Sequence, residues 1–336
     1  MSKSPKLICK NVWKLYGDKP KEFLHKYNNN PDQEIIKQNG YIQAIRNASL
    51  EVYENEILVI MGLSGSGKST LVRCMSRLVD PTSGEIFFEN IDMGKLSKNE
   101  LIEIRRHKMG MVFQHFALFP HRTVIENIAF PLEVQGINKK EREKSALEII
   151  ELVGLEGRED YFPKELSGGQ QQRVGIGRSL AVKPELWFLD EPFSALDPLI
   201  RKEMQNEFLK IQNTLKKTII FITHDFDEAI KLADRIIIMN EGKIVQIGSP
   251  EDLIMKPADD YVKEFTKDLP RERLLSVKSI MDNKKYPNNS TTVYKDEKIF
   301  SVLEKVLSEG SVSVIDKSNN IVGSLNKETI SKFINN

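Results

Sequence analysis

The sequence lacks the features that mark disulfide-stapled, secreted or membrane-spanning chains. Its only two cysteines, Cys9 and Cys74, are not spaced as a CxxC pair, so we expect free reduced thiols rather than a disulfide or a metal site. No uncharged apolar run approaches the roughly 18 residues that a membrane-spanning helix needs. The first residues contain no apolar core of the kind found in signal peptides, so we expect a chain that stays in the cytoplasm.

The sequence also lacks an excess of charge of either sign. The chain has 49 Lys and Arg against 48 Asp and Glu, which leaves a net charge of +1. Bulk binding to nucleic acid requires a basic excess or stripe, so the sequence predicts no nucleic-acid partner. Internal repeats and low-complexity tracts are also missing. The 40% hydrophobic and 29% charged residues are ordinary for a folded protein, and 336 residues predict two domains.

The apolar pattern divides the chain into regions. Residues 5–60 largely alternate apolar and polar positions, which predicts an antiparallel β-region interrupted by a polar stretch with short helical pieces. The pattern is mostly helical over about 120–185. Apolar strands separated by helical segments then follow, which predicts a largely parallel sheet. Beyond a polar linker, residues 276–336 show strand pieces and a helix.

A glycine-rich loop carries the strongest chemical signal. Residues Gly62–Ser69 read G-L-S-G-S-G-K-S, which fits G-x-x-x-x-G-K-[ST] between a predicted strand and a predicted helix. In such a loop the backbone N–H groups point at phosphate oxygens, and the helix N-terminus adds partial positive charge. The alternative is a Gly/Ser turn with an incidental lysine, which the flanking strand and helix make the weaker interpretation.

This loop therefore predicts an ATP site. We expect Lys68 to bind the β- and γ-phosphates and the Ser69 hydroxyl to ligate Mg²⁺. The nucleotide-binding residues predicted for the loop and the start of the helix are Gly62, Ser64, Gly65, Gly67, Lys68, Ser69 and Thr70.

An acidic pair supplies the second half of the predicted site. Leu186–Glu191 reads L-W-F-L-D-E, so Asp190 ends a buried strand, where P-loop enzymes hold the Mg²⁺ shell. Glu191 follows at once, and a carboxylate there can accept a proton from the attacking water or orient that water. An acidic pair after a strand could instead cap a helix, but the upstream phosphate loop favours the catalytic interpretation.

A third motif resembles that of a known protein family. Leu166–Arg173 reads L-S-G-G-Q-Q-Q-R, which resembles the signature motif of ABC ATPases and stands, as in that family, between the phosphate loop and L-D-E. The resemblance implies an α/β P-loop NTPase domain with an antiparallel β-subdomain and a helical subdomain. It also implies that Ser167, Gly168, Gly169 and Gln170 bind the ATP held by a second subunit, at a helix N-terminus suited to phosphate.

The same resemblance implies the remaining catalytic and metal-binding residues. Gln114 resembles the Q-loop glutamine, which touches Mg²⁺ and faces the permease. His224 resembles the switch histidine, which contacts the γ-phosphate and helps to hold the water that Glu191 activates. The implied catalytic set is Glu191, His224 and Gln114, and the implied Mg²⁺ set is Ser69, Gln114 and Asp190.

Two further positions complete the implied nucleotide site. Ser194–Asp197 resembles the D-loop that crosses the dimer, and Asp197 is counted among the nucleotide-binding residues. Tyr16 resembles the aromatic residue that stacks on adenine. An ordinary strand aromatic is the alternative for Tyr16, and Trp13 and Tyr41 are weaker candidates for the stacking role.

A narrower resemblance covers nearly the whole chain. The segments IMGLSGSGKST, MVFQHFALFPHRTV, FSALDPLIR and PADDYVKEF are similar to the glycine betaine/proline importer ATPases, as are an insert between Tyr16 and Tyr41 and a C-terminal extension like a CBS domain. This implies an ATP-binding domain over 1–270, with its helical subdomain at about 115–185. Residues 276–336 would be a single or truncated CBS-like regulatory domain, where the family commonly has two repeats.

The resemblance also implies partners and a location. We expect a homodimer that binds ATP and Mg²⁺, contacts integral-membrane permease subunits, and works with a periplasmic or tethered solute-binding protein. Its place would be peripheral, on the cytoplasmic side of the inner membrane. An ATPase of another importer class and a non-transport ABC ATPase stay open as alternatives. The solute also stays open among betaine, proline betaine, choline, carnitine and trimethylamine N-oxide.

Overall fold

The computed structural model describes residues 4–114, 116–267, 269, 271–283 and 291–334. The chain forms two compact units, Met1–Ile247 and Gly248–Asn336. Within the described residues, no helix is both long enough and apolar enough to cross a membrane. The helices and strands of the first unit are β1 (Pro5–Tyr16), α1 (Pro20–Lys26), α2 (Gln33–Gln38), β2 (Ile42–Tyr53), β3 (Ile57–Met61), α3 (Lys68–Met75), β4 (Ser83–Phe88), β5 (Ile91–Asp92), α4 (Lys98–Lys108), β6 (Met109–Val112), α5 (Val124–Val134), α6 (Lys139–Leu152), η1 (Pro163–Glu165), α7 (Gly168–Leu180), β7 (Leu186–Asp190), α8 (Pro198–Leu215), β8 (Thr218–Ile222), α9 (Phe226–Leu232), β9 (Arg235–Asn240) and β10 (Lys243–Gly248).

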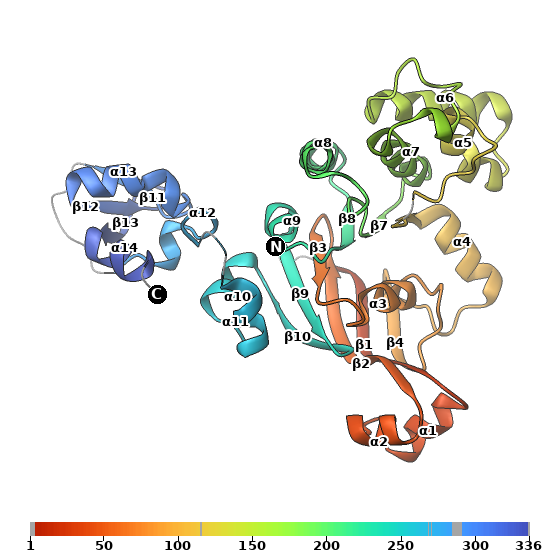
Figure 1. Cartoon of the computed structure of the whole chain (residues 1–336), viewed down its shortest axis with the longest axis horizontal. Coiled ribbons are helices and arrows are strands. Elements are labelled where there is room, and N and C mark those ends of the chain that lie inside the picture. Colours follow the sequence, from red (N-terminus) through yellow and green to blue (C-terminus); the bar gives the residue numbers. More distant parts are fainter. Residues whose placement is uncertain (1–3, 115, 268, 270, 284–290, 335–336) are drawn as a thin grey trace. The chain divides into compact units, whose positions relative to one another are not determined.

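A six-stranded sheet with the order β10-β9-β3-β8-β7-β6 forms the centre of the first unit (Figure 1). Strand β3 runs parallel to both β8 and β9, and β7 runs parallel to β6 and β8. Every residue of β3, β7 and β8 is buried, as expected for parallel strands covered on both faces. The predicted largely parallel sheet is confirmed.

A second sheet, with the order β2-β1-β4-β5, is antiparallel. Its β1–β2 pair places Cys9 opposite Leu50 and Tyr16 opposite Ile42. One buried apolar cluster joins this sheet to α3 and to the central sheet. The predicted antiparallel region is therefore present, and β4 and β5 join it from further along the chain. Cys9 and Cys74 are both buried and free.

The helices α5, α6 and α7 group together at one side of the first unit (Figure 1). Thr123 caps α5 in a reciprocal pair with Glu126, and the Asn138 side chain caps α6, so both helix starts are fixed by local hydrogen bonds. A Cβ at Gly177 of α7 would lie 3.0 Å from Ile149 and 3.1 Å from Ile128. The three helices thus meet closely at a small residue, within the range predicted for the helical subdomain.

The second unit carries a three-stranded sheet with the order β11-β12-β13, in which β11 is parallel and β13 antiparallel to β12. The domain boundary predicted at 270–276 lies inside this unit, because Ile254 packs with Leu275 and Ile299, and the Ser276 N–H donates to Glu251 at 2.8 Å. Its elements are α10 (Pro250–Met255), α11 (Asp260–Thr266), α12 (Arg271–Leu274), η2 (Val277–Ser279), β11 (Thr292–Tyr294), α13 (Ile299–Glu309), β12 (Ser311–Ile315), β13 (Ile321–Asn326) and α14 (Lys327–Ile334).

Candidate functional site

The predicted phosphate loop connects the end of β3 to the start of α3, as the motif requires. Gly67 precedes the helix with φ of 99°, and a Cβ there would lie 2.1 Å from the carbonyl oxygen of Ala44. Only glycine fits this close approach. Lys68 opens the helix, and its ammonium donates to the carbonyl oxygens of Gly62 at 2.8 Å and Leu63 at 3.0 Å.

The Lys68 ammonium is placed where it can bind an anion. Burial lowers its pKa, and the charges of Glu191 and Asp190 act in the opposite direction. An ammonium has three N–H donors, and two of them are used on the loop carbonyls. One donor is left to bind a phosphate oxygen.

Asp190 is the last residue of β7 and is 5% exposed. The Ser69 hydroxyl donates to Asp190 Oδ1 at 3.0 Å, so the two predicted metal ligands lie together. Burial raises the pKa of Asp190, and the hydrogen bond from Ser69 lowers it. Hydroxyl and carboxylate oxygens suit Mg²⁺, which commonly takes the rest of its shell from substrate phosphates and water. In the described part of the chain, no group of three or more His, Cys, Asp or Glu could hold a metal alone.

Two of the predicted catalytic residues converge on a carboxylate oxygen of the third, Glu191. Glu191 follows β7 with φ of 47°, and its backbone N–H donates to the carbonyl of Ile222 at 3.1 Å. Gln114 Nε2 donates to Glu191 Oε2 at 3.2 Å, and His224 Nδ1 lies 3.3 Å from the same oxygen. Gln114 follows β6 and His224 follows β8, so the two parallel strands on either side of β7 deliver both side chains to the same edge of the sheet. This arrangement can orient a carboxylate toward a water molecule.

The signature motif lies at the N-terminus of α7. Ser167 is the N-cap residue, and its side chain and that of Gln170 form a reciprocal capping box. A Cβ at Gly169 would lie 2.8 Å from Ile200, so this helix end packs on the start of α8. In the described residues, the side chains of Ser167 and Gln170 each accept a hydrogen bond from the other's backbone N–H at this helix start. Their contact with ATP stays a prediction.

The predicted D-loop turn is held by hydrogen bonds from Arg201, a residue that the sequence analysis did not identify. Asp197 is exposed and caps α8 by accepting from the Ile200 N–H at 3.1 Å. Arg201, one turn later, donates to the carbonyl of Leu196 at 3.1 Å and lies 3.5 Å from Asp225. It thus links the D-loop turn to the segment after the switch histidine. Its i+4 spacing from Asp197 is the signal that could have identified it.

The candidates for adenine stacking differ in exposure. Tyr16 ends β1, is 43% exposed, and has the Lys14 ammonium 4.9 Å from its ring centroid. Trp13 is 1% exposed in the core and is not available to a ligand, so its candidacy is wrong. Tyr41 is partly buried and packs against Gly17. Of these candidates, Tyr16 has the most exposed ring on which an adenine base could stack.

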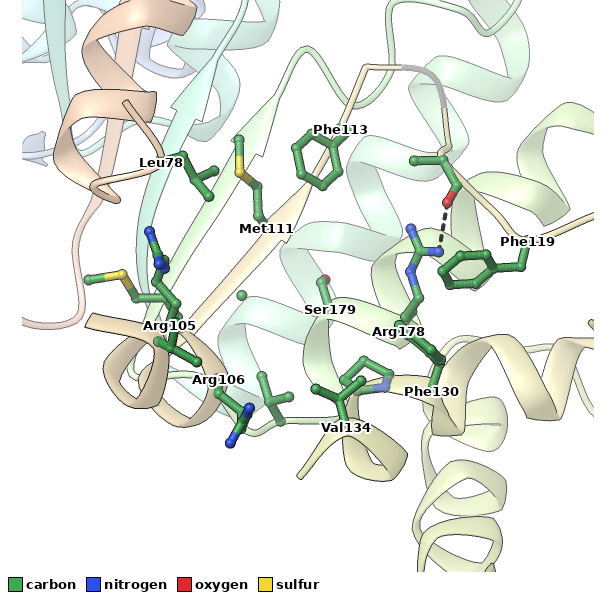
Figure 2. Close-up of a pocket in the computed structure, with 16 residues that line it drawn as sticks. Leu78, Arg105, Arg106, Met111, Phe113, Phe119, Phe130, Val134, Arg178 and Ser179 are labelled. Carbon is green, nitrogen blue, oxygen red and sulfur yellow. Dashed lines mark hydrogen bonds between the residues drawn. The ribbon is translucent and has the colours of Figure 1, made fainter. Parts of the chain in front are cut away.

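A groove of about 520 Å³ lies between α4 and β6 on one side and α5 and α7 on the other (Figure 2). Its walls are mostly apolar and include Met111, Phe113, Phe119, Phe130 and Val134. All charged side chains that line it are arginines, namely Arg105, Arg106 and Arg178. The groove thus combines apolar surface with positive charge.

Arg178 connects this groove to the segment after Gln114. Its guanidinium donates to the carbonyl oxygens of Ala117 at 2.7 Å and Phe116 at 3.2 Å, and Figure 2 shows the first of these bonds. Both residues have left-handed backbones, with φ of 35° at Phe116 and 49° at Ala117. Burial lowers the pKa of Arg178, and no carboxylate is among its partners in the described residues.

The resemblance implies that Gln114 faces the permease, and residues 116–121, which follow it, are partly packed against the chain's own helices. Asn127 of α5 accepts from the Phe119 N–H at 2.9 Å and donates to its carbonyl at 3.1 Å, and the Phe119 ring packs on Phe130. Phe119 therefore packs on the chain's own helical subdomain while also lining the groove. Residue 115 lies outside the described residues.

Comparisons with known proteins show a family profile, full-length relatives and a solved structure that resemble this chain. A family profile described as ABC transporter matches residues 45–194. Over 328 residues the chain is 56% identical to the trimethylamine N-oxide transport system ATP-binding protein TmoW of Pelagibacter ubique (strain HTCC1062), covering 97% of this chain and 96% of that protein. It is 46% identical over 319 residues to the glycine betaine transport ATP-binding protein OpuAA of Bacillus subtilis (strain 168), covering 95% of this chain and 75% of that protein.

Among solved structures, the chain is similar to a dimeric post-hydrolysis state of the ATP-binding cassette MJ0796 bound to ADP and Pi. The TM-score is 0.60 and the sequence identity 35%, over 72% of this chain and 98% of that one.

Proposed function

This chain belongs to the ATP-binding subunits of ABC transporters, and from that premise we propose that its ATPase activity drives the import of a small quaternary amine or amine oxide. The family membership makes it an ATPase coupled to transport. The assignment of solute class rests on full-length similarity to a trimethylamine N-oxide transport protein and to glycine betaine transport proteins.

For the hydrolytic step we assign Glu191 as the residue that orients the attacking water and accepts its proton. The observation that supports this is the convergence of Gln114 and His224 on Glu191 Oε2. Lys68, with one free donor, would bind the β- and γ-phosphates. Ser69 and Asp190, with Gln114 as a third candidate, would hold Mg²⁺, which supplies positive charge against the phosphate oxygens.

We further propose that ATP is bound between two copies of this chain. Ser167 and Gly168 are exposed at a helix N-terminus, where the Ser167 and Gln170 side chains bond within the motif itself. A second subunit can present this motif to the γ-phosphate, with the exposed D-loop residue Asp197 near the same boundary. The solved relative MJ0796 is dimeric.

The groove beside Arg178 is the surface that we assign to the permease. Its lining is apolar with only arginines as charged groups, so it fits an amphipathic segment that carries one or more acidic side chains. Ala117 and Phe119 line this groove, and Gln114, close to them in the sequence, contacts Glu191, which would link permease contact to the hydrolytic residue. The chain would then lie on the cytoplasmic face of the membrane without crossing it.

Two matched substitutions test this surface. Val134 lines the groove on α5 and is 48% exposed, whereas Leu147 on α6 is 46% exposed and does not line it. We expect Val134→Glu to abolish permease-stimulated ATP hydrolysis, because a buried carboxylate would face the docked segment, while basal ATP binding is kept. Leu147→Glu should behave as wild type. Equal stimulation in both variants would count against the groove.

The solute class is tested in proteoliposomes that contain this chain, its own membrane subunits and its own solute-binding protein. Trimethylamine N-oxide, glycine betaine, proline betaine, choline and carnitine are added in turn, and phosphate release is measured. We expect at least one of them to stimulate ATP hydrolysis. A variant with Lys68→Ala should release no phosphate with any of them. Stimulation by an unrelated solute such as a sugar, with none by these five, would exclude the class and leave the ATPase assignment intact.

For the C-terminal unit we propose a CBS-like repeat that pairs with that of a second subunit. The helix–strand–strand–helix order of α13, β12, β13 and α14 supports this assignment. Phe300 and Leu307 are 54% and 57% exposed on α13, seven residues apart and therefore on one face. Pairing would cover that face and hold subunits together independently of ATP.

A further inference from the structure

The segment between β1 and β2, residues 17–41, is an insert with its own small core. Phe23 on α1 and Ile36 on α2 are buried in one cluster with Trp13 of β1. Helices α1 and α2 lie together beyond the ends of β1 and β2 (Figure 1). The insert thus packs on the strand whose last residue is Tyr16.

One aromatic side chain of the insert holds the two residues that follow Tyr16. A Cβ at Gly17, which has φ of 153°, would lie 2.4 Å from Tyr41 Cδ1, so the Tyr41 ring rests directly on that backbone. The Tyr41 hydroxyl donates to the Asp18 carbonyl. The ring is itself held by Phe23, with centroids 4.2 Å apart and planes at 29°.

The insert is also tied to the phosphate loop through the turn between β9 and β10. Gln33 Nε2 donates to Glu241 Oε2 at 3.0 Å, and Gln43 Nε2, at the start of β2, donates to the Glu241 carbonyl at 2.7 Å. In the same turn the Gly242 N–H donates to the Ser66 carbonyl at 3.0 Å. Hydrogen bonds therefore connect the insert to the loop that would bind the phosphates.

We propose that the insert is a positioning element for the base end of the nucleotide, with Tyr41 as the residue that fixes the Tyr16 ring relative to the phosphate loop. The proposal rests on the stacking role assigned to Tyr16. A nucleotide must reach the stacking ring and the phosphate loop at once, so a ring that is ordered beforehand saves the free energy of ordering it on binding. Loss of Tyr41 would loosen the ring and leave the loop unchanged.

Calorimetric titrations of the full chain with two ligands test this role in Mg²⁺ buffer. ATP uses both ends of the site, and inorganic tripolyphosphate uses the phosphate loop alone. We expect Tyr16→Ala to weaken ATP binding by about 5- to 150-fold, the range for loss of one base–aromatic stack. Tyr41→Ala should weaken ATP binding by about 5- to 10-fold, leave tripolyphosphate binding unchanged, and be rescued by Tyr41→Phe, which keeps the ring.

Tyr27→Ala is the matched control, because Tyr27 belongs to the same insert and packs on the same Phe23 ring at 5.1 Å; it should bind ATP as wild type does. Where Tyr41→Ala does not fold, Gly17→Ala perturbs the same contact from the other side and should give the same ligand selectivity.

Three outcomes would overturn the inference. Unchanged ATP affinity in Tyr41→Ala, with weakened affinity in Tyr16→Ala, refutes the positioning role alone. Unchanged affinity in Tyr16→Ala refutes the stacking assignment on which the inference rests. Equal weakening of ATP and tripolyphosphate in Tyr41→Ala shows a general structural defect instead of a base-specific one.

Discussion

Replacing Glu191 by glutamine removes the proposed base but keeps an oxygen that its hydrogen-bonding neighbours can use. The Glu191 carboxylate oxygen accepts from Gln114 Nε2 at 3.2 Å and lies 3.3 Å from His224 Nδ1. A glutamine of the same length can keep its oxygen at the Oε2 position, where it can accept from Gln114 and from a histidine nitrogen that carries a proton. We therefore expect Glu191→Gln to fold and to bind ATP normally.

The expected loss lies in the chemical step. Removal of a general base costs on the order of 10²–10⁴ in rate, or roughly 2.7–5.4 kcal/mol in the activation barrier. The neighbouring carboxylate cannot readily replace it, because Asp190 is 5% exposed and accepts a hydrogen bond from Ser69. We therefore expect a loss of about 10³-fold or more, together with an ATP-bound dimer that persists.

The assay is phosphate release with the permease present, beside ATP affinity and subunit assembly. Glu185→Gln is the control, since Glu185 stands just before the other end of β7 and pairs with Lys6 and Lys108; its turnover should match wild type. Turnover of Glu191→Gln within about threefold of wild type would remove Glu191 from the mechanism.

The other predictions concern subunit sharing, metal binding and the C-terminal unit. In mixed dimers, one subunit with Lys68→Ala and one with Ser167→Arg should keep one intact composite site and about half of the hydrolysis; complete loss would mean that each site is built within one chain. Because burial raises the pKa of Asp190, its ionised form costs folding stability once the pH exceeds that pKa, and the protonated form does not. Without Mg²⁺, the Tm of Asp190→Asn should therefore exceed that of wild type by roughly 2–4 °C at pH 8 and by less in acid. MgADP should raise the Tm of wild type but not that of the variant. Equal Tm values for the two proteins at pH 8 without Mg²⁺ would contradict this. A chain truncated after Leu275 should assemble less well without ATP, and sedimentation that shows equal assembly would refute pairing of the C-terminal units.

The local parts of the site were accessible from the sequence. The motif around Lys68 specifies its own strand–turn–helix context, and the four apolar residues before Asp190 place that carboxylate at a strand end. Ser167 followed three residues later by Gln170 is a capping box, so the helix start at the signature was also recoverable. In each case the chemistry depends on residues close in sequence.

The parts that depend on long-range packing were not accessible. Nothing near Arg178 in the sequence indicates that its guanidinium binds carbonyls some 60 positions upstream. The contact of Tyr41 with Gly17 depends on how the insert folds back on itself. The unit boundary after Ile247 depends on packing between α10 and residues beyond 270. Trp13 and Tyr16 look alike as strand aromatics, and only the tertiary fold buries one and exposes the other.

The bonds from Arg178 to two strained backbone carbonyls have an energetic consequence. A partly buried cation whose described hydrogen bonds go to neutral carbonyls gains more from an incoming carboxylate than from the carbonyls that it gives up. The left-handed conformations of Phe116 and Ala117 are costly in themselves, so this turn would relax once released. An acidic contact in the groove would favour the released arrangement by as much as it binds that arrangement more tightly than the other. Through Gln114, that shift would change how long the Glu191 carboxylate spends oriented for hydrolysis.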